Sequence, residues 1–198
     1  IVVESDWSSA SYFYSIIALS EIGSEITLSA YKKESLQGDS CLVEIYQHFG
    51  VETLFDTHSI RLKKTKKTKN NILEIDLKNA PDIAQTIAVT CFAENIPCNL
   101  VGLHTLKIKE TDRLEALKEE LSNLGAIIAV TEQSLHLETS SVIHENIAIK
   151  TYNDHRMAMA LSLLSLCTEG IEVANPEVVT KSWPTFFADM TSILGANE

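Results

Sequence analysis

The spacing of apolar residues along the chain repeats three times. Three segments begin with alternating apolar and polar residues, which is typical of a half-buried strand, reach an aspartate, and continue as an almost unbroken apolar helix. The segments span residues 1–19, 73–91 and 147–165, and their aspartates are Asp6, Asp82 and Asp154. A helix that is apolar nearly all round must be buried on every side. The pattern therefore predicts three buried helices at equivalent places in a repeat.

The remainder of each unit follows the same order along the chain. A second strand is predicted at residues 25–29, 98–101 and 171–174. A helix with a single apolar stripe is predicted near residues 40–49, 111–124 and 184–194. Each of these helices reaches a glycine, the residue that most easily adopts the left-handed conformation at a helix end: Gly50, Gly125 and Gly195. Strand pairs follow in the first two units only, at 51–54 with 59–63 and at 127–131 with 135–138.

These patterns predict one α/β domain of the α+β type over residues 1–198. We expect three βαβαββ repeats with pseudo-threefold symmetry, the buried helices lying inside mixed sheets. The repeat units span approximately residues 1–64, 72–139 and 146–198, and the third unit stops after its helix. Because the chain opens with a strand-like Ile-Val-Val and no Met, we expect it to be a fragment of a longer protein.

Composition narrows the function classes. The 198 residues are 45% hydrophobic, which is enough for a sizeable core, and the net charge of -11 argues against a nucleic-acid partner. No run of 18 apolar residues occurs, so we expect no membrane partner. The stretch at residues 61–69 is basic, and we interpret it as a solvated hairpin end and linker. Four cysteines lie in apolar stretches without a C-x-x-C pair, so we expect reduced core residues of a cytoplasmic protein: Cys41, Cys91, Cys98 and Cys167.

Comparing the repeats separates scaffold from candidate chemistry. The aspartate before each buried helix is shared, and its ordinary role would be to cap the helix by accepting backbone N–H bonds. We assign Asp6 to that role. For Asp82 and Asp154 a cap and a ligand contact both remain open, because a helix N-terminus is already a binding surface.

Some charged residues have no counterpart in another unit. Lys109, Glu110 and Arg113 precede or open the second striped helix, whereas the first unit has only Asp39 in common with the second, where it corresponds to Asp112. Lys109 and Arg113 are four residues apart and share a face at the positive end of a helix dipole. An anion bound there would relieve the repulsion; the alternative is an ordinary charged first turn in which Glu110 pairs with Arg113.

Two further cations lie in the third unit. Arg156 takes the place of small residues in the first turn of a buried helix, where it is costly unless it meets an anionic ligand or a neighbouring acid. Lys181 lies roughly where Lys109 does in its own unit, although a solvated loop lysine is the alternative. His155 alone is more often structural than catalytic. A ligand with a phosphate and a carboxylate would suit these cations, because Arg binds both groups in a bidentate manner.

Two motifs then carry a family resemblance. KETDR at residues 109–113 and NDHRMAM at residues 153–159 resemble signatures of the 5-enolpyruvylshikimate-3-phosphate synthase family. Residues 4–13, 81–82 and 180–184 also match that family in order, so the resemblance covers essentially the whole chain, as a C-terminal half. It implies a fold of two domains, each of three βαβαββ units, that close over the substrates. The N-terminal domain is then absent from this chain.

The resemblance also implies roles. The activity would be transfer of the enolpyruvyl group of phosphoenolpyruvate to the 5-hydroxyl of shikimate 3-phosphate. Asp82 and Glu110 resemble the proton-transfer carboxylates, and Asp154 and His155 are expected to support the site. The residues expected at shikimate 3-phosphate are Asp82, Lys109 and Thr105, the last standing where bacterial members usually carry an Asn. The residues expected at phosphoenolpyruvate are Arg113, Arg156 and Lys181.

The remaining expectations concern partners and alternatives. The resemblance implies no metal or other cofactor, a monomer, and the N-terminal half of the same enzyme as a partner. Without that half we expect the chain to fold but to be inactive or nearly so. The alternative enzyme is the transferase of the same fold that acts on UDP-N-acetylglucosamine, and the two motifs favour the shikimate enzyme. A non-catalytic repeat module, with purely structural charges, is the second alternative.

Overall fold

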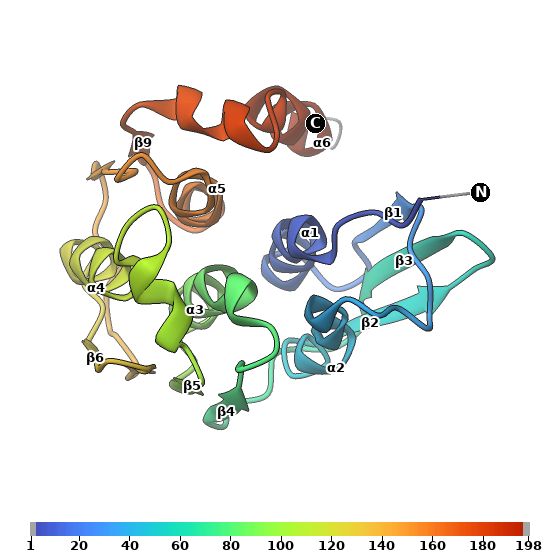
Figure 1. Ribbon diagram of the computed structural model, residues 1–198, viewed down its shortest axis with the longest axis horizontal. Helices are drawn as coiled ribbons and strands as arrows, with labels where there is room; N and C mark the ends of the chain where they lie inside the picture. Colours follow the sequence, from blue (N-terminus) through green and yellow to red (C-terminus); the bar gives the residue numbers. More distant parts are fainter. Residues whose placement is uncertain (1–2, 196–198) are drawn as a thin grey trace.

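Three helices form the centre of the molecule. The computed structural model describes residues 3–195. In Figure 1, helices α1 (Trp7–Leu19), α3 (Ala84–Ala93) and α5 (His155–Ser162) lie in the middle, and α3 contacts both of the others. Nine of the ten residues of α3 are buried, as are eleven of the thirteen residues of α1. The prediction of buried helices is confirmed, because such apolar surfaces can be satisfied only by packing on all sides.

In the expected first unit, an antiparallel three-stranded sheet packs against one side of α1. Strands β1 (Glu25–Ser29), β2 (Val51–Phe55) and β3 (Ser59–Lys64) pair in the order β1-β3-β2. The predicted striped helix at residues 40–49 is wrong in extent. A 3-10 turn, η1 (Gly38–Cys41), leads into a short α2 (Leu42–Ile45), and the chain then turns towards Gly50. Both Tyr46 and Phe49 are fully buried, so the turns direct two large side chains into the core at the expense of helix.

The opening strand predicted for the first unit is also not found in residues 3–6, which form no strand, and the two residues before them lie outside the described part. Ser5 links residues 3–6 to the sheet region: its N–H donates to the Ala30 carbonyl at 2.7 Å and its hydroxyl to the Ser29 carbonyl at 3.1 Å. Because no neighbouring strand pairs with residues 3–6, they form an irregular connection to α1 and not a strand.

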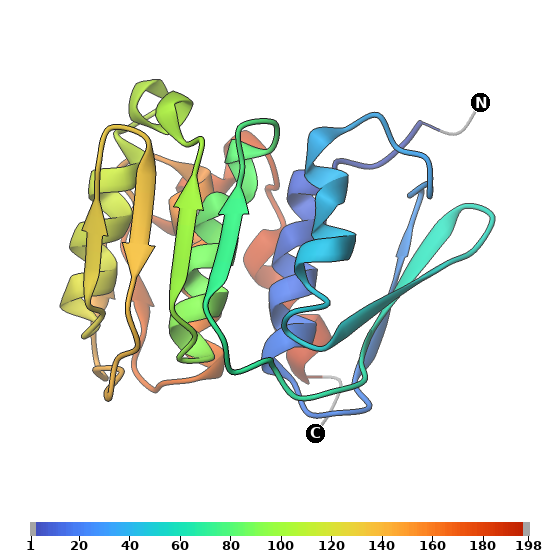
Figure 2. The same ribbon diagram turned by 90° about the horizontal axis from the view of Figure 1, so that it is seen from below.

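The second unit carries a mixed four-stranded sheet. Strands β4 (Leu73–Asp76), β5 (Cys98–Val101), β6 (Ile128–Val130) and β7 (Ser134–Leu137) pair in the order β4-β5-β7-β6. The β4–β5 pair is parallel and the others are antiparallel. Figure 2 shows this sheet in front of α3 and α4 (Arg113–Asn123). Helix α4 buries one stripe, formed by Leu114, Leu117 and Leu121, as the sequence predicted.

The third unit is the smallest in the described residues. Strands β8 (Ala148–Ile149) and β9 (Glu172–Val173) form a parallel pair. Helix α5 continues as η4 (Leu163–Leu166), and η5 (Pro176–Lys181) precedes α6 (Phe186–Gly195). Helix α6 therefore begins two residues after the predicted start at Pro184, and Gly195 is its last residue. Taken together, the molecule is a mixed α/β fold with mixed sheets.

Two expectations about individual side chains are wrong. Lys64, predicted to lie on a solvated stretch, is 4% exposed. Its ammonium donates to the carbonyls of Ala18 and Phe49, and lies 3.8 Å from Glu94 Oε1. A lysine that satisfies two carbonyls at the ends of helical segments can be buried because its charge is paired. Cys167, predicted to be a core residue, is exposed, because it lies in the turn after η4.

The other cysteines are more enclosed. Cys91 and Cys98 are buried and Cys41 is half-buried, all as free thiols. Within residues 3–195 no helix is both long enough and apolar enough to cross a bilayer.

Candidate active site

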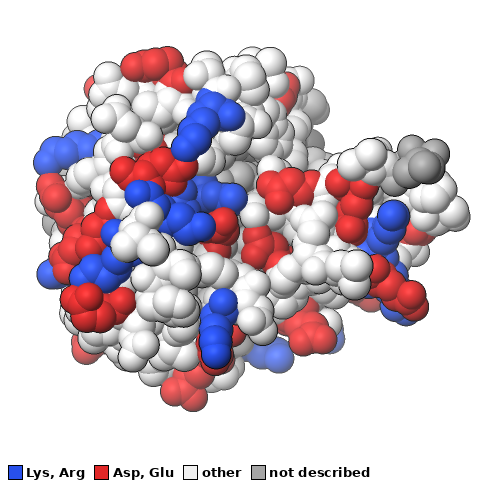
Figure 3. Space-filling model, viewed as in Figure 1, with Lys and Arg blue, Asp and Glu red and all other residues white. Residues whose placement is uncertain are grey.

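The N-terminal ends of α3, α4 and α5 meet on one face of the molecule. Figure 3 shows Lys and Arg side chains gathered beside Asp and Glu over this region. The residues that meet there come from two of the three units, and we call them the charged cluster: Lys109, Arg113, Arg156 and Lys181 with Asp82, Glu110 and Asp154. The sequence-predicted cations and carboxylates therefore converge on one site.

The two aspartates left open by the sequence differ in what they bind. Asp154 caps α5, accepting from the backbone N–H of Arg156 at 2.8 Å and of Met157 at 3.4 Å. Asp82 caps nothing, because it lies inside η2 (Pro81–Ile83), a 3-10 turn that Pro81 begins before α3. Its carboxylate is therefore free to face the cations.

Three cations surround the Asp82 carboxylate. Lys109 Nζ lies 3.2 Å and Arg113 Nη1 3.1 Å from Oδ1, while Arg156 Nη2 lies 3.4 Å from Oδ2. Arg156 Nη1 also reaches the Asp82 carbonyl at 3.4 Å. Burial acts to raise the pKa of Asp82, but the charges of Arg156, Lys109 and Arg113 outweigh it and lower that pKa below its ordinary value. In this state Asp82 is a carboxylate at neutral pH.

Glu110 is held by two cations, one of which, Arg113, it shares with Asp82. Arg113 Nη2 donates to Oε2 at 2.8 Å, and Lys181 Nζ contacts Oε1. The Lys181 contact, helped by a backbone hydrogen bond and the Arg113 charge, lowers the pKa of Glu110 to about 2 against the opposing effect of burial. The ring of His155 lies nearby, with Nδ1 4.0 Å from Oε1, and burial lowers the pKa of His155. His155 Nδ1 is buried and has no hydrogen-bond partner in the described residues.

Arg113 joins both carboxylates to a third. Its side chain is 2% exposed, and its Nε donates to Asp154 Oδ2 at 2.7 Å. Asp154 itself is fully buried. A buried guanidinium is tolerated because it is neutralised and its N–H groups are bonded. The pairing of Glu110 with Arg113 considered from the sequence is therefore present, but it is one part of a larger network.

The other two cations lie nearer the solvent. Arg156 is half-buried and pairs with Asp82, the arrangement that the sequence offered as an alternative to ligand binding. Lys181 has a side chain that is 57% exposed and still reaches Glu110 across the boundary between units. Thr105 is less well placed: its hydroxyl is buried and unpartnered in the described residues. Thr105 lies outside the charged cluster, although η3 (His104–Ile108), which carries it, contacts η2.

Sequence reasoning missed two polar residues at this site. Gln85 is 1% exposed in α3; with its amide oxygen turned toward Arg113 it donates to the Asp82 carbonyl at 3.2 Å and accepts from Arg113 Nε at 3.3 Å. Ser8 donates to Asp39, a carboxyl whose pKa burial raises. The available signal was a polar residue inside an otherwise apolar buried helix, which usually needs a bonded partner.

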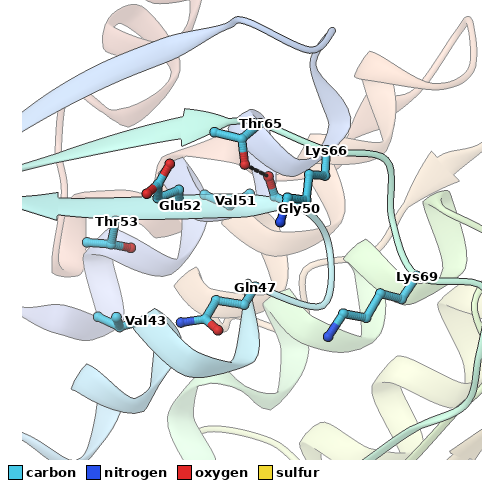
Figure 4. A pocket seen from close by; sticks show the side chains of 9 residues that line it. All are labelled: Val43, Gln47, Gly50, Val51, Glu52, Thr53, Thr65, Lys66 and Lys69. Carbon is cyan, nitrogen blue, oxygen red and sulfur yellow. Dashed lines mark hydrogen bonds between the residues drawn. The ribbon is translucent and has the colours of Figure 1, made fainter.

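A separate hollow of about 530 Å³ lies between α2, β2 and the segment after β3 (Figure 4). Gln47, Glu52, Lys66 and Lys69 are among its lining residues, and none of the lining residues belongs to the charged cluster. In the described part of the chain, no three His, Cys, Asp or Glu side chains are grouped so that they could hold a metal ion.

The chain is similar to proteins of one enzyme family. The family profile for EPSP synthase (3-phosphoshikimate 1-carboxyvinyltransferase) matches residues 1–190. A 3-phosphoshikimate 1-carboxyvinyltransferase of Bacteroides fragilis is 42% identical over 190 residues, which is 95% of this chain and 46% of the relative. One from Buchnera aphidicola is 34% identical over 191 residues, covering 96% of this chain and 43% of the relative.

Solved structures share the fold. EPSP synthase from Acinetobacter baumannii superimposes with a TM-score of 0.78 at 23% identity, covering 96% of this chain and 46% of that one. The enolpyruvyl transferase NikO from Streptomyces tendae gives a TM-score of 0.68 at 13% identity, with 96% and 43% covered. The chain thus spans less than half the length of the curated relatives it matches. It belongs to the EPSP synthase (3-phosphoshikimate 1-carboxyvinyltransferase) family.

Proposed function

We propose that this chain supplies half of the active site of an enzyme that transfers the enolpyruvyl group of phosphoenolpyruvate to the 5-hydroxyl of shikimate 3-phosphate and releases phosphate. This step belongs to the shikimate pathway to aromatic amino acids. One observation carries the proposal: two carboxylates, Asp82 and Glu110, share Arg113 and are surrounded by three more cations. Such a site offers proton-transfer groups and anion ligands together.

The cations of the cluster divide between the two substrates. Lys109 and the Thr105 hydroxyl, with the Asp82 carboxylate, take shikimate 3-phosphate. The Thr105 hydroxyl is buried and has no hydrogen-bond partner within residues 3–195, so its hydrogen-bonding capacity is unused in the free chain. Arg113, Arg156 and Lys181 take the phosphate and carboxylate of phosphoenolpyruvate, because Arg matches both groups with two parallel N–H bonds. Fixing both substrates in line lowers the entropic part of the barrier.

The reaction requires two proton transfers at carbon and one at oxygen. Proton addition to C3 of phosphoenolpyruvate makes C2 cation-like, and the 5-hydroxyl attacks C2 as it loses its proton. The tetrahedral adduct then loses phosphate from C2 and a proton from the methyl group, which regenerates the carbon–carbon double bond. Asp82 and Glu110 exchange these protons, and a positioned acid or base typically contributes about 10²–10⁴-fold to the rate.

Binding of the substrate anions also changes the pKa of Glu110. In the free chain Lys181 and Arg113 keep the pKa of Glu110 near 2, which is too low for a proton donor at neutral pH. A phosphate or carboxylate that binds these cations competes with Glu110 for them. Removing the cause of the lowered pKa raises it, and so prepares Glu110 for proton transfer only when substrate is present.

The proposal extends to the architecture and the partner. The three units form βαβαββ repeats related by pseudo-threefold symmetry in one domain, the third being the least complete in the described residues. The N-terminal half of the same enzyme closes over the charged cluster and supplies further anion ligands. The active protein is a cytoplasmic monomer that contains both halves, and residues 1–198 alone are inactive or nearly so.

The test is the release of inorganic phosphate by the natural full-length protein, with both substrates and with each alone. Glu110→Gln should lower kcat by about 10²–10⁴-fold. The matched control is Glu115→Gln in α4, the helix that follows Glu110. Glu115 is exposed, its one ion pair among the described residues is with Lys118 at 3.2 Å, and the variant should stay within about twofold of wild type.

Other outcomes would decide between the alternatives. Phosphate release that depends on UDP-N-acetylglucosamine instead of shikimate 3-phosphate would assign the chain to the other transferase reaction. The absence of release with either acceptor would favour a non-catalytic module.

A further inference from the structure

We propose that Asp154 is a positioning residue, which fixes the Arg113 guanidinium with one edge turned toward Asp82 and Glu110, where the anion of phosphoenolpyruvate would bind. This inference rests on the proposed function. It assigns to the buried aspartate a task beyond the capping of α5.

The hydrogen bonds define two edges of the guanidinium. Asp154 takes the side edge, with Oδ2 2.7 Å from Nε and Oδ1 3.3 Å from Nη2. The end edge faces the other way, with Nη1 3.1 Å from Asp82 Oδ1 and Nη2 2.8 Å from Glu110 Oε2. Because a guanidinium is planar and rigid, fixing the side edge also fixes the direction of the end edge.

Burial separates the permanent partner from the exchangeable ones. The Asp154 side chain is 0% exposed and that of Arg113 is 2% exposed, whereas those of Asp82 and Glu110 are 27% and 25% exposed. A ligand arriving from solvent therefore meets Asp82 and Glu110 first. It can displace them from Arg113 while the Asp154 contact, which lies behind the guanidinium, is retained.

Asp154 also connects Arg113 to a second proposed ligand of phosphoenolpyruvate. Its Oδ1 accepts a hydrogen bond from the backbone N–H of Arg156 at 2.8 Å, and the same oxygen accepts one from Arg113 Nη2 at 3.3 Å. One carboxylate thus contacts the guanidinium of Arg113 on α4 and the backbone of Arg156 at the start of α5. The distance between the two arginines would determine which ligands with two anionic groups can bind both of them.

Capping alone does not require this arrangement. Asp6 caps α1 through the N–H groups of Ser8 and Ser9, and Asp112 caps α4 through those of Leu114 and Glu115. In the described residues, neither of these capping carboxylates accepts a hydrogen bond from an arginine or lies within 4 Å of a guanidinium nitrogen. The contact with Arg113 is therefore an addition to the cap, which makes the two roles separable by substitution.

The experiment compares Asp154→Asn with Asp112→Asn in the full-length protein. Asn caps a helix as well as Asp does, so both variants keep their helix start. In Asp154→Asn the amide cannot accept from both N–H groups of the side edge, so the KM for phosphoenolpyruvate should rise by about tenfold or more. The KM for shikimate 3-phosphate should stay within about threefold, and both values should be unchanged in Asp112→Asn.

A fall in melting temperature without a change in the KM for phosphoenolpyruvate would show that Asp154 only caps and stabilises, and would overturn the proposal. An equal rise in both KM values would overturn it too, because the effect would not be specific to the arginines. Should Asp154→Asn fail to fold, Asp154→Ser keeps a capping oxygen without placing an amide against Arg113, and the same selective rise is expected.

A readout without turnover separates this inference from the proposed function. The Nε–H of Arg113 should give a sharp, exchange-protected ¹⁵N–¹H resonance in wild type and in Asp112→Asn, assigned by its loss in Arg113→Lys. It should broaden in Asp154→Asn. If wild type turns over neither substrate, the proposed function fails, but the Nε–H resonance still reports whether Asp154 fixes the Arg113 guanidinium. A sharp resonance in Asp154→Asn would contradict the positioning role of Asp154.

Discussion

The substitution Asp82→Asn probes the balance of charge in the cluster. It keeps the size of the side chain and removes the carboxylate on which Lys109, Arg113 and Arg156 converge. The charged cluster contains four cations and three carboxylates, so its excess positive charge rises from one to two. We therefore expect opposite effects on stability and on anion affinity.

The magnitudes follow from the three contacts. The pairs with Lys109 and Arg156 are partly exposed, where an ion pair contributes about 0.2–1 kcal/mol, and the pair with Arg113 is more buried. The free energy of unfolding should fall by about 1–3 kcal/mol, which lowers Tm by about 2–12 °C for a domain of this size. The value of kcat should fall by about 10²–10⁴-fold. The KM for phosphoenolpyruvate should not rise, because the freed cations are more available to it.

Phosphate release and thermal unfolding of the full-length protein measure these quantities. Asp112→Asn is the matched control, because that aspartate caps α4 and its carboxylate lies 3.7 Å from the ammonium of Lys107, outside the charged cluster. It should change neither kcat nor KM. A Asp82→Asn variant that retains wild-type kcat, or that binds phosphoenolpyruvate about tenfold more weakly, would refute the reasoning.

Three further predictions concern pH dependence, the buried Lys64 and the activity of residues 1–198 alone. Because the fold lowers the pKa values of Asp82 and Glu110, both carboxylates stabilise the folded state at a pH above their unfolded pKa values, which are near 3.9 and 4.3. This stabilisation should be lost as the pH falls from about 5 towards 2. In urea unfolding, Glu110→Gln should lose less stability over the same pH range than wild type. Lys64→Met leaves two carbonyls without their ammonium, and should lower the free energy of unfolding by about 2–4 kcal/mol in the same assay; an unchanged midpoint would contradict the buried role. Residues 1–198 alone should release no phosphate until the N-terminal half is added back.

Much of the fold could be predicted from the sequence because it is set by apolar periodicity. The bounds of β1 and β5 match the predicted strands, and the helices expected to be buried are buried. The short α2 could not be predicted, because its end depends on where Tyr46 and Phe49 find space in the core. The burial of Lys64 likewise depends on which carbonyls the fold brings beside it.

The sequence indicated which charged residues would gather, but not their geometry, and Thr105 does not join them. Comparing the repeats singled out the cations, and the structure brings them together. The sequence could not separate Asp82 from Asp154, because both precede a buried helix. The difference is a 3-10 turn that begins at Pro81 and moves Asp82 away from the capping position, whereas Asp154 caps α5 and holds Arg113. Gln85 could not be predicted, because the sequence of an apolar helix does not indicate which of its faces contacts an arginine from another helix.

The most direct test of the convergence of cations on an anion site is a crystal structure of the full-length protein with phosphoenolpyruvate. The account predicts its phosphate and carboxylate within hydrogen-bonding distance of Arg113, Arg156 and Lys181, with the Lys181 ammonium withdrawn from Glu110. A ligand bound elsewhere on the protein, with every ion pair of the charged cluster intact, would contradict it.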